Sequence, residues 1–470
     1  MSAATLPSES STLTFLGAAG TVTGSRFLIE TAASTVLVDA GLFQGLKKLR
    51  LRNWDGFPVV PADIDAILIT HAHVDHLGYL PRLVTGGFKG RVICTRGTHD
   101  LARVVLPDSG HLQEEEARFA NRMGFSKHHP ALPLYTEADA RAALELLEPV
   151  DFDTPIAVTD DLTATFRLAG HILGSATIEV ALLRSGRSVL FSGDLGRPQH
   201  PILTPPAPPG SADVIVMEST YGGRRHDDLG ATTELAEAIS RTAKRGGTVV
   251  IPAFAVDRTE VVLFHLRALM ESGAIPSLPI YADSPMALRA LSIYRHAIDD
   301  HWLDVRPGLH EQRDVFDTGQ LHEVREVEES KALASAPYPA IIVSASGMAT
   351  GGRVLHHLAR LLPDPRNTVI LVGFQAAGTR GRSLADGHSE IRMFGAEVPV
   401  RAEVLNLESF SVHADHRELI DWVGSATRKP EIVYVVHGEP AAAEALRDGI
   451  ASDLGWPVHV AHHLERVSLG

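Results

Sequence analysis

Residues 70–78 have the sequence THAHVDHLG, which contains the histidine-rich pattern HxHxDH. The apolar run before it predicts a buried strand that feeds a loop, where several side chains can point to one place. Imidazole and carboxylate groups are ligands for zinc or manganese, and one tetrahedral ion cannot use all four and keep an open position. We therefore predict two ions. The alternation lets His71 and His73 face one ion, while Asp75 and His76 reach the other. A surface histidine cluster is the alternative, but the strand context and the interleaved acid do not fit it.

Two ions need further ligands, and the ends of later strands are where we expect them. His171 follows the strand-like run 163–168, and Asp194 follows the run 188–190. Glycines beside both residues permit close approach of the backbone. Each residue alone would more often be an ordinary turn residue, but the cluster at 70–78 favours ligation.

The composition of the chain limits the classes of protein to which it can belong. It has 470 residues, of which 44% are apolar and 21% charged, as expected for a soluble globular protein of two or three domains. Its one cysteine, Cys94, lies in a strand-like run and cannot form an internal disulfide. The net charge of −14 argues against capture of nucleic acid by bulk electrostatics, but it does not exclude a local basic groove.

Two absences predict the cellular location. Residues 1–11, MSAATLPSESS, lack the basic start and apolar core of a signal peptide. No stretch approaches the roughly 18 apolar residues of a membrane helix. The sequence therefore predicts a cytoplasmic protein with no membrane association.

The chain changes its rhythm after the proline-rich stretch 200–210, which we interpret as a linker or surface loop. Before it, short strands alternate with turns, and a helix at 98–122 is expected to be interrupted near Pro107. After it, strands and helices alternate, and this predicts a parallel sheet.

Four segments resemble the ordered motifs of the metallo-β-lactamase superfamily: VLVDAG at 36–41, HAHVDH at 71–76, AGHILGS at 169–175 and SGDLG at 192–196. The resemblance implies an α/β fold, an αββα sandwich with metals at one edge. It implies that His171 joins His71 and His73 on the first ion, that Asp75 and His76 hold the second, and that Asp194 bridges both. Asp39 would orient a ligand or a water molecule.

Three more segments are similar to the additional motifs of the β-CASP nucleases, a group that includes bacterial RNase J and the endonuclease of eukaryotic mRNA 3′-end processing. They are VMESTYG at 216–222, ESFSVHAD at 408–415 and VYVVHGE at 433–439. The segments IPAFAVDRTE, YADSPMAL, SASGMATGGR and GFQAAGTRGRSL resemble the same group. The predicted domains are a first metallo-β-lactamase part at 1–222, an inserted parallel-sheet βα (β-CASP) domain at 223–411 and a second metallo-β-lactamase part at 412–470.

The resemblance also implies roles for single residues. His437 completes the second ion, and a histidine at this point is associated with RNA substrates in the family. His413 would protonate the leaving oxygen, with Glu218 holding its ring. Asp415 and His416 look like half of a metal motif, but we interpret them as the first turn of a helix. Asp257 and Ala345 depart from the family pattern, which commonly has glycine and serine there.

The predicted function is that of a metal-dependent ribonuclease. A hydroxide shared by two Zn²⁺ ions per chain, with Mn²⁺ as the alternative metal, would attack single-stranded RNA and leave 5′-phosphate and 3′-hydroxyl ends. Asp39, Asp75, Glu218 and His413 would carry the chemistry, and the candidate substrate contacts are Ser344, Ser346, Arg353, Arg380 and Arg382. Two other functions stay open at this point: a thioester or lactone hydrolase, and a non-catalytic RNA-processing scaffold. Endonuclease versus exonuclease action and a homodimeric state are also open.

Overall fold

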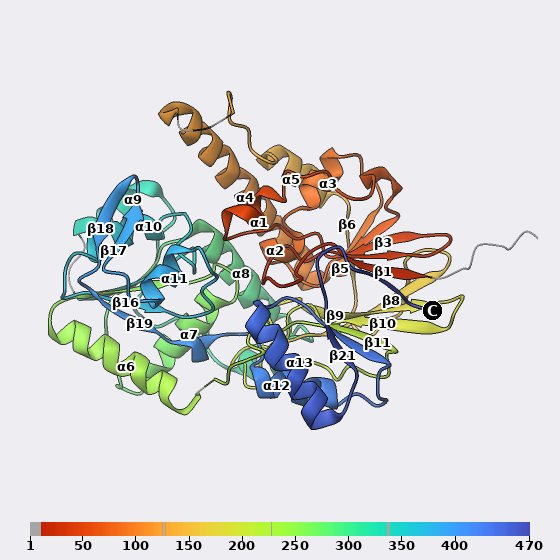
Figure 1. Ribbon diagram of the computed structural model, residues 1–470. Coiled ribbons are helices and arrows are strands. Elements are labelled where there is room, and N and C mark those ends of the chain that lie inside the picture. Colours follow the sequence, from red (N-terminus) through yellow and green to blue (C-terminus); the bar gives the residue numbers. More distant parts are fainter. Residues whose placement is uncertain (1–10, 125, 127, 227, 336–338) are drawn as a thin grey trace, which may run out of the picture.

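The computed structural model describes residues 11–124, 126, 128–226, 228–335 and 339–470. Over these residues, two seven-stranded sheets face each other (Figure 1). The first sheet has antiparallel pairing on one side and parallel pairing from β3 onward. In spatial order its strands are β22 (Arg466–Ser468), β1 (Thr12–Phe15), β2 (Phe27–Glu30), β3 (Thr35–Val38), β4 (Ala66–Leu68), β5 (Arg91–Thr95) and β6 (Leu147–Val150).

The second sheet is also mixed, with parallel pairing from β21 to β10 and antiparallel pairing from β10 to β7. Its order is β21 (Val458–Val460), β20 (Ile432–Val435), β11 (Val214–Met217), β10 (Arg187–Phe191), β9 (Ala176–Leu182), β8 (Leu162–Leu168) and β7 (Ile156–Ala157). As a result, the carboxyl ends of β8, β10, β11 and β20 lie at one edge of this sheet.

The inner faces of the two sheets form one apolar core. Successive residues of a strand point to opposite faces, and in β8 the buried residues alternate with half-buried ones. Phe15 and Phe27 from the first sheet and Phe166 and Phe191 from the second meet in this core. Each large apolar side chain buried in this way contributes about 1.5–3 kcal/mol.

Helices cover the two outer faces, which gives the predicted αββα sandwich (Figure 1). On the first sheet lie α3 (Leu80–Thr85), α4 (Arg96–Met123) and α5 (Glu137–Leu144), and on the second lie α12 (His416–Gly424) and α13 (Pro440–Leu454). Asp415 caps α12, since its side chain accepts from the backbone N–H groups of Arg417 and Glu418. This confirms that Asp415 and His416 begin a helix.

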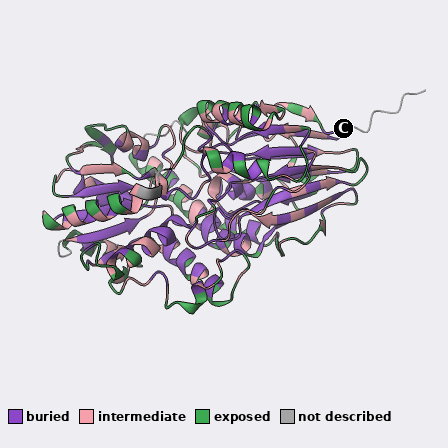
Figure 2. Cartoon of the chain, turned by 90° about the horizontal axis from the view of Figure 1, so that it is seen from below, coloured by how far each residue is buried: buried purple, intermediate pink, exposed green. Residues whose placement is uncertain are grey.

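The inserted domain contains a parallel sheet, as predicted. Its order is β14 (Leu321–Glu323), β13 (Ile280–Ala282), β15 (Ala340–Ser344), β12 (Thr248–Pro252), β16 (Thr368–Leu371) and β19 (Glu403–Asn406). Every residue of β12 and β15 is buried, as expected for parallel strands covered on both faces (Figure 2). The accompanying helices are α6 (Asp228–Lys244), α7 (Arg258–Glu271), α8 (Pro285–Asp299), α9 (Val327–Ala332), α10 (Val354–Leu361) and α11 (Arg380–Ala385).

The remaining elements are short. They are α1 (Lys47–Leu51), α2 (Val74–Leu77), the hairpin of β17 (Glu390–Met393) and β18 (Ala396–Pro399), and the 3₁₀ turns Pro61–Asp63, Leu309–Glu311, Leu333–Ser335 and Glu408–Phe410. Within the described ranges, none of the helices combines the length and the apolar character needed to cross a bilayer.

The chain leaves the sandwich after β11 and returns to it at α12 and β20. Because β20 pairs in parallel with β11, the two strands flanking the insert are neighbours. The predicted domain limits 1–222, 223–411 and 412–470 stay a prediction at the level of single residues.

Two local predictions were wrong. Helix α4 runs unbroken through Pro107, which is buried in the packing of this helix. Next to it, a Cβ at Gly110 would lie 2.8 Å from the backbone of Glu137, so α5 packs directly on this turn. This packing outweighs the hydrogen bond that proline removes. The stretch 200–210 is not a plain surface loop either, because Ile202 and Leu203 are buried in the core.

Candidate metal centre

Strand ends from both sheets converge at one edge of the sandwich. The HxHxDH loop follows β4, and α2 begins inside it, with His73 at the N-cap. The segment after β3 supports this loop, since Ala40 N donates to His76 O and Gly41 packs on Asp75. A Cβ at residue 41 would lie 1.7 Å from the Asp75 carbonyl oxygen, so only glycine permits this approach.

The first group of potential ligands comes from three separate loops. His73 Nδ1 lies 3.1 Å from His71 Nε2 and 3.2 Å from His171 Nε2. Asp194 Oδ2 lies 3.5 Å from His71 Nε2 and 3.6 Å from His171 Nε2. A tetrahedral zinc site with bonds of about 2.0–2.1 Å has ligand–ligand edges of about 3.3–3.4 Å. The four atoms therefore fit one zinc ion.

The second group lies beside the first. His76 Nε2 is 3.2 Å from His437 Nε2, and His437 Nε2 is 3.4 Å from Asp75 Oδ2. Asp194 Oδ1 lies 3.2 Å from His76 Nε2, so this carboxylate presents one oxygen to each group. The predicted metal ligands thus meet in the arrangement that the sequence implied, and one of them comes from beyond the insert.

The ionisation of these histidines suits metal binding. Burial lowers the pKa of His73 to about 4 and lowers the pKa of His71 and His171 well below the usual value. These rings are neutral near pH 7, which is the form that binds a metal. Burial also opposes the charge on His76, but Asp194 and Asp39 outweigh it and raise the pKa of that ring. Asp194 Oδ1 is buried without a hydrogen-bond partner, a state that a bound cation would relieve.

Asp39 orients one of these ligands. It has a left-handed φ of +60° directly after β3 and is fully buried. Its Oδ2 lies 2.7 Å from His76 Nδ1, and its Oδ1 accepts from Thr70 N at 2.8 Å. The pairing leaves His76 Nε2 for the metal group.

His413 and Glu218 lie at the border of the metal groups. His413 Nδ1 is 3.2 Å from Glu218 Oε1 and 4.0 Å from Asp194 Oδ2. Glu218 is fully buried, and its carboxylate also accepts from Leu195 N at 2.7 Å and Thr220 N at 3.2 Å. Because Glu218 is fixed by the backbone, it holds the ring of His413 in one orientation.

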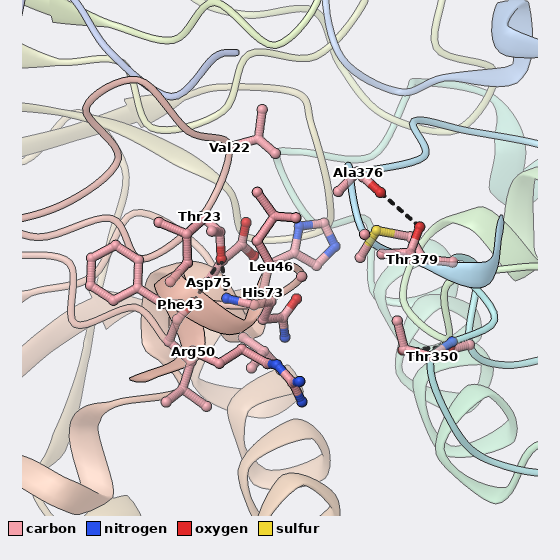
Figure 3. A pocket seen from close by; sticks show the side chains of 18 of the residues that line it. Val22, Thr23, Phe43, Leu46, Arg50, His73, Asp75, Thr350, Ala376 and Thr379 are labelled. Atoms are coloured by element: carbon pink, nitrogen blue, oxygen red, sulfur yellow. Dashed lines mark hydrogen bonds between the residues drawn. The ribbon is translucent and has the colours of Figure 1, made fainter. Parts of the chain in front are cut away.

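A cleft of about 1510 Å³ opens from the metal groups, with both domains lining it. Figure 3 shows His73 and Asp75 near the first wall and two loops of the insert opposite. The labelled residues of the first wall are Val22, Thr23, Phe43, Leu46 and Arg50, and those of the insert are Thr350, Ala376 and Thr379. Phe254, near His73 with ring centroids 6.4 Å apart, also lines the cleft.

Two of the five candidate substrate contacts line this cleft, namely Ser346 and Arg380. Arg380 donates to the carbonyl oxygens of Thr350 at 3.1 Å and of Arg392 at 2.9 Å, so part of its guanidinium is already engaged.

The other three candidates are engaged elsewhere in the insert and are not among the residues lining the cleft. Ser344 Oγ donates to Asp283 O at 2.8 Å, and Arg353 pairs with Asp283 Oδ1 at 2.8 Å. Arg382 pairs with Asp386 one turn along α11 at 2.9 Å.

Sequence reasoning missed several supporting hydroxyls. Thr220 Oγ1 lies 3.2 Å from His437 Nδ1, Thr70 Oγ1 lies 2.9 Å from Asp39 Oδ2, and Ser25 Oγ lies 3.2 Å from His76 Nε2. Thr70 and Thr220 stand inside recognised motifs, so their position was a usable signal. Ser25 has no such signal, because only the fold brings it to the centre.

Comparisons with known proteins agree with this geometry. The model of the metallo-beta-lactamase superfamily matches residues 19–225, the Beta-Casp domain matches 259–384, and the Zn-dependent metallo-hydrolase RNA specificity domain matches 397–461. A crystal structure of a protein of unknown function from Enterococcus faecalis covers 98% of this chain, and all of that chain, at 12% identity and a TM-score of 0.53. It therefore shares the fold.

Three curated relatives cover most of the chain. Ribonuclease TTHA0252 of Thermus thermophilus is 38% identical over 92% of this chain and 94% of its own length. The transcription termination factor FttA of Pyrococcus abyssi is 33% identical over 97% of this chain and 71% of its own length. An RNase J-like protein of Methanocaldococcus jannaschii is 32% identical over 87% and 88%. The chain therefore belongs to the metallo-β-lactamase superfamily and, within it, to the β-CASP enzymes that carry the Zn-dependent metallo-hydrolase RNA specificity domain.

Proposed function

We propose that this protein is a metal-dependent ribonuclease that hydrolyses phosphodiester bonds of single-stranded RNA and leaves 5′-phosphate and 3′-hydroxyl ends. The observation that carries the proposal is the position of His413 and Glu218 beside two adjoining ligand groups that line an interdomain cleft. The names of two relatives, a ribonuclease and an RNase J-like protein, support RNA as the substrate. The RNA specificity model also spans both His413 and His437.

The donor set suits two Zn²⁺ ions, with Mn²⁺ as the alternative. His71, His73 and His171 would hold the first, Asp75, His76 and His437 the second, with Asp194 between them. When bound, the ions would lower the pKa of a water molecule and offset the charge that develops on the phosphate.

The protein's own groups supply the rest of the reaction. Asp39 keeps His76 in one tautomer, so Nε2 stays available as a ligand. Glu218 accepts from Nδ1 of His413, which leaves Nε2 as the atom that gives a proton to the departing 3′ oxygen. The buried site restricts water, which strengthens these interactions.

The size of the cleft favours a polymer over a small thioester or lactone. Pockets for small ligands are usually about 300–1,000 Å³, whereas this cleft has about 1510 Å³. Arg50, Arg380 and Arg392 line it, and this local charge suits a phosphate backbone in a chain whose net charge is −14. A non-catalytic scaffold is disfavoured, because the whole ligand set is in place.

The test is cleavage of an end-labelled single-stranded RNA and of the DNA of the same sequence, with zinc or manganese and with a chelator. We expect metal-dependent cleavage of RNA, its loss in His73→Ala, and parent-like cleavage in His128→Ala, a surface histidine. Substrates with 5′-phosphate and 5′-hydroxyl ends separate end-dependent from internal cutting. Cleavage that resists the chelator, or an equal rate on DNA, would refute the proposal.

A further inference from the structure

The loop that carries the metal ligand His171 is held by the inserted domain. Two successive backbone N–H groups of this loop donate to buried side chains of the insert: Leu173 N to Tyr294 Oη at 2.9 Å, and Gly174 N to Asp304 Oδ2 at 2.6 Å. Both acceptors are buried, with exposed fractions of 0% and 4%. We propose that Tyr294 and Asp304 are positioning residues of the metal centre, which fix the His171 loop so that the first ion binds tightly.

His171 depends on its backbone for a specific reason. Metal-binding histidines usually donate their second ring nitrogen to an acceptor that orients the ring. His76 has Asp39 for this purpose, and His437 has Thr220. His171 Nδ1 is buried without a hydrogen-bond partner. Its ring is therefore aimed by the loop itself, and the loop is aimed by Tyr294 and Asp304.

The hydrogen bond from Tyr294 is part of a directed chain. His200 Nδ1 accepts from Leu203 N at 2.9 Å, so its Nε2 carries the proton and donates to Asp257 Oδ2 at 3.0 Å. Tyr294 Oη donates to Asp257 Oδ1 at 2.7 Å. Its oxygen is then left as the acceptor for Leu173 N. Each group in the chain has a single fitting role, so the loop cannot shift without breaking it.

Asp257 is the anchor of this chain and has a costly backbone conformation. Its φ is +67°, in the region that favours glycine. Such a conformation costs on the order of 1–3 kcal/mol and persists only where neighbours fix it. Burial, and next the Asp257 carboxylate, raise the pKa of Tyr294 well above its usual value, so the phenol keeps the proton it donates.

Direct metal titration tests the proposal without RNA; the inference rests on the metal centre of the proposed function, but it survives if the substrate is something else. The metal-free protein is titrated with Zn²⁺ against a chromophoric chelator. We expect two tight equivalents for the parent. In Tyr294→Phe, which keeps the ring, one equivalent should weaken about 10–100-fold and the other should stay unchanged.

Tyr135→Phe is the matched control, because it also removes a buried hydroxyl, hydrogen-bonded to Ser109 Oγ at 2.7 Å, but has no link to the loop. It should bind both equivalents as the parent does. Unweakened binding in Tyr294→Phe, equal weakening of both equivalents, or the same loss in the control would overturn the proposal.

Asp304 supplies a second, independent measurement. Asp304→Ala should weaken the same equivalent, and Asp304→Asn should restore it, since an amide oxygen still accepts from Gly174 N. The absorption of the Co²⁺-substituted proteins should report a changed geometry at one site in Asp304→Ala and a parent-like spectrum in Asp304→Asn. Failure of asparagine to restore the affinity would mean that Asp304 does not act through this hydrogen bond.

Discussion

Replacing His413 with alanine should stop proton delivery to the leaving group and keep the metal centre. The ring lies 3.2 Å from Glu218, at the border of the ligand groups, and its side chain is 13% exposed. It is not a member of either histidine-rich ligand group. General acid help is worth about 10²–10⁴ in rate, which corresponds to about 3–5 kcal/mol in the barrier. We expect the kcat of His413→Ala to fall by that factor with both metal equivalents retained.

The assay uses two RNA substrates that differ at one atom. In the second, sulfur replaces the 3′ bridging oxygen at the cleaved position, and a thiolate leaves without needing a proton. The parent and His413→Ala should then differ less than about tenfold on the sulfur substrate, whereas they differ about 10²–10⁴-fold on the natural one. Glu218→Gln should fall between them, because Leu195 N can still fix the side chain. An equal defect on both substrates, or loss of metal in His413→Ala, would refute the assignment.

Three further predictions concern metal binding and stability. Asp39→Asn should weaken the second ion about 10–100-fold in a zinc titration, because one of the two donors that the carboxylate accepts from would face an NH₂ group. Gly41→Ala should lower the unfolding free energy by about 3 kcal/mol and abolish cleavage, since its methyl would lie 1.7 Å from Asp75 O, whereas Gly56→Ala meets nothing within 4 Å and should resemble the parent in urea unfolding. Burial, and next a neighbouring histidine, lower the pKa of His265 to about 4, below its unfolded value of about 6.5. The unfolded state therefore binds the extra proton, and stability should fall by about 3 kcal/mol as the pH drops from 7 to 4. Urea unfolding of the metal-free parent should lose that much more stability than His265→Gln, and equal losses would contradict the pKa assignment.

The metal ligands were predictable because their signal is local. HxHxDH follows an apolar strand, and His171 and Asp194 follow strands next to glycines, so chain direction alone places them at one sheet edge. The αββα sandwich and the parallel sheet of the insert followed from the resemblance and from the alternation of strands and helices.

The rest depends on contacts between distant segments. Arg353 has the same local sequence setting as a phosphate ligand, but the buried carboxylate of Asp283 binds it instead. Tyr294 lies on an ordinary amphipathic helix, and no pattern indicates that its hydroxyl reaches Leu173. Pro107 would end an isolated helix, and only the packing of α4 keeps that helix continuous. Such outcomes depend on tertiary structure and leave no periodic mark in the sequence.

The pairing of β11 with β20 has a consequence for the order of events during synthesis. The second ion needs Asp75 and His76 from early in the chain and His437 from near its end, a separation of 361 residues between the two histidines. The ribosome must therefore translate almost the whole message before this cation can be captured. A nascent polypeptide that still lacks β20 has no complete hydrolytic centre, so the messenger RNA that encodes the enzyme is not exposed to its activity while it is being read.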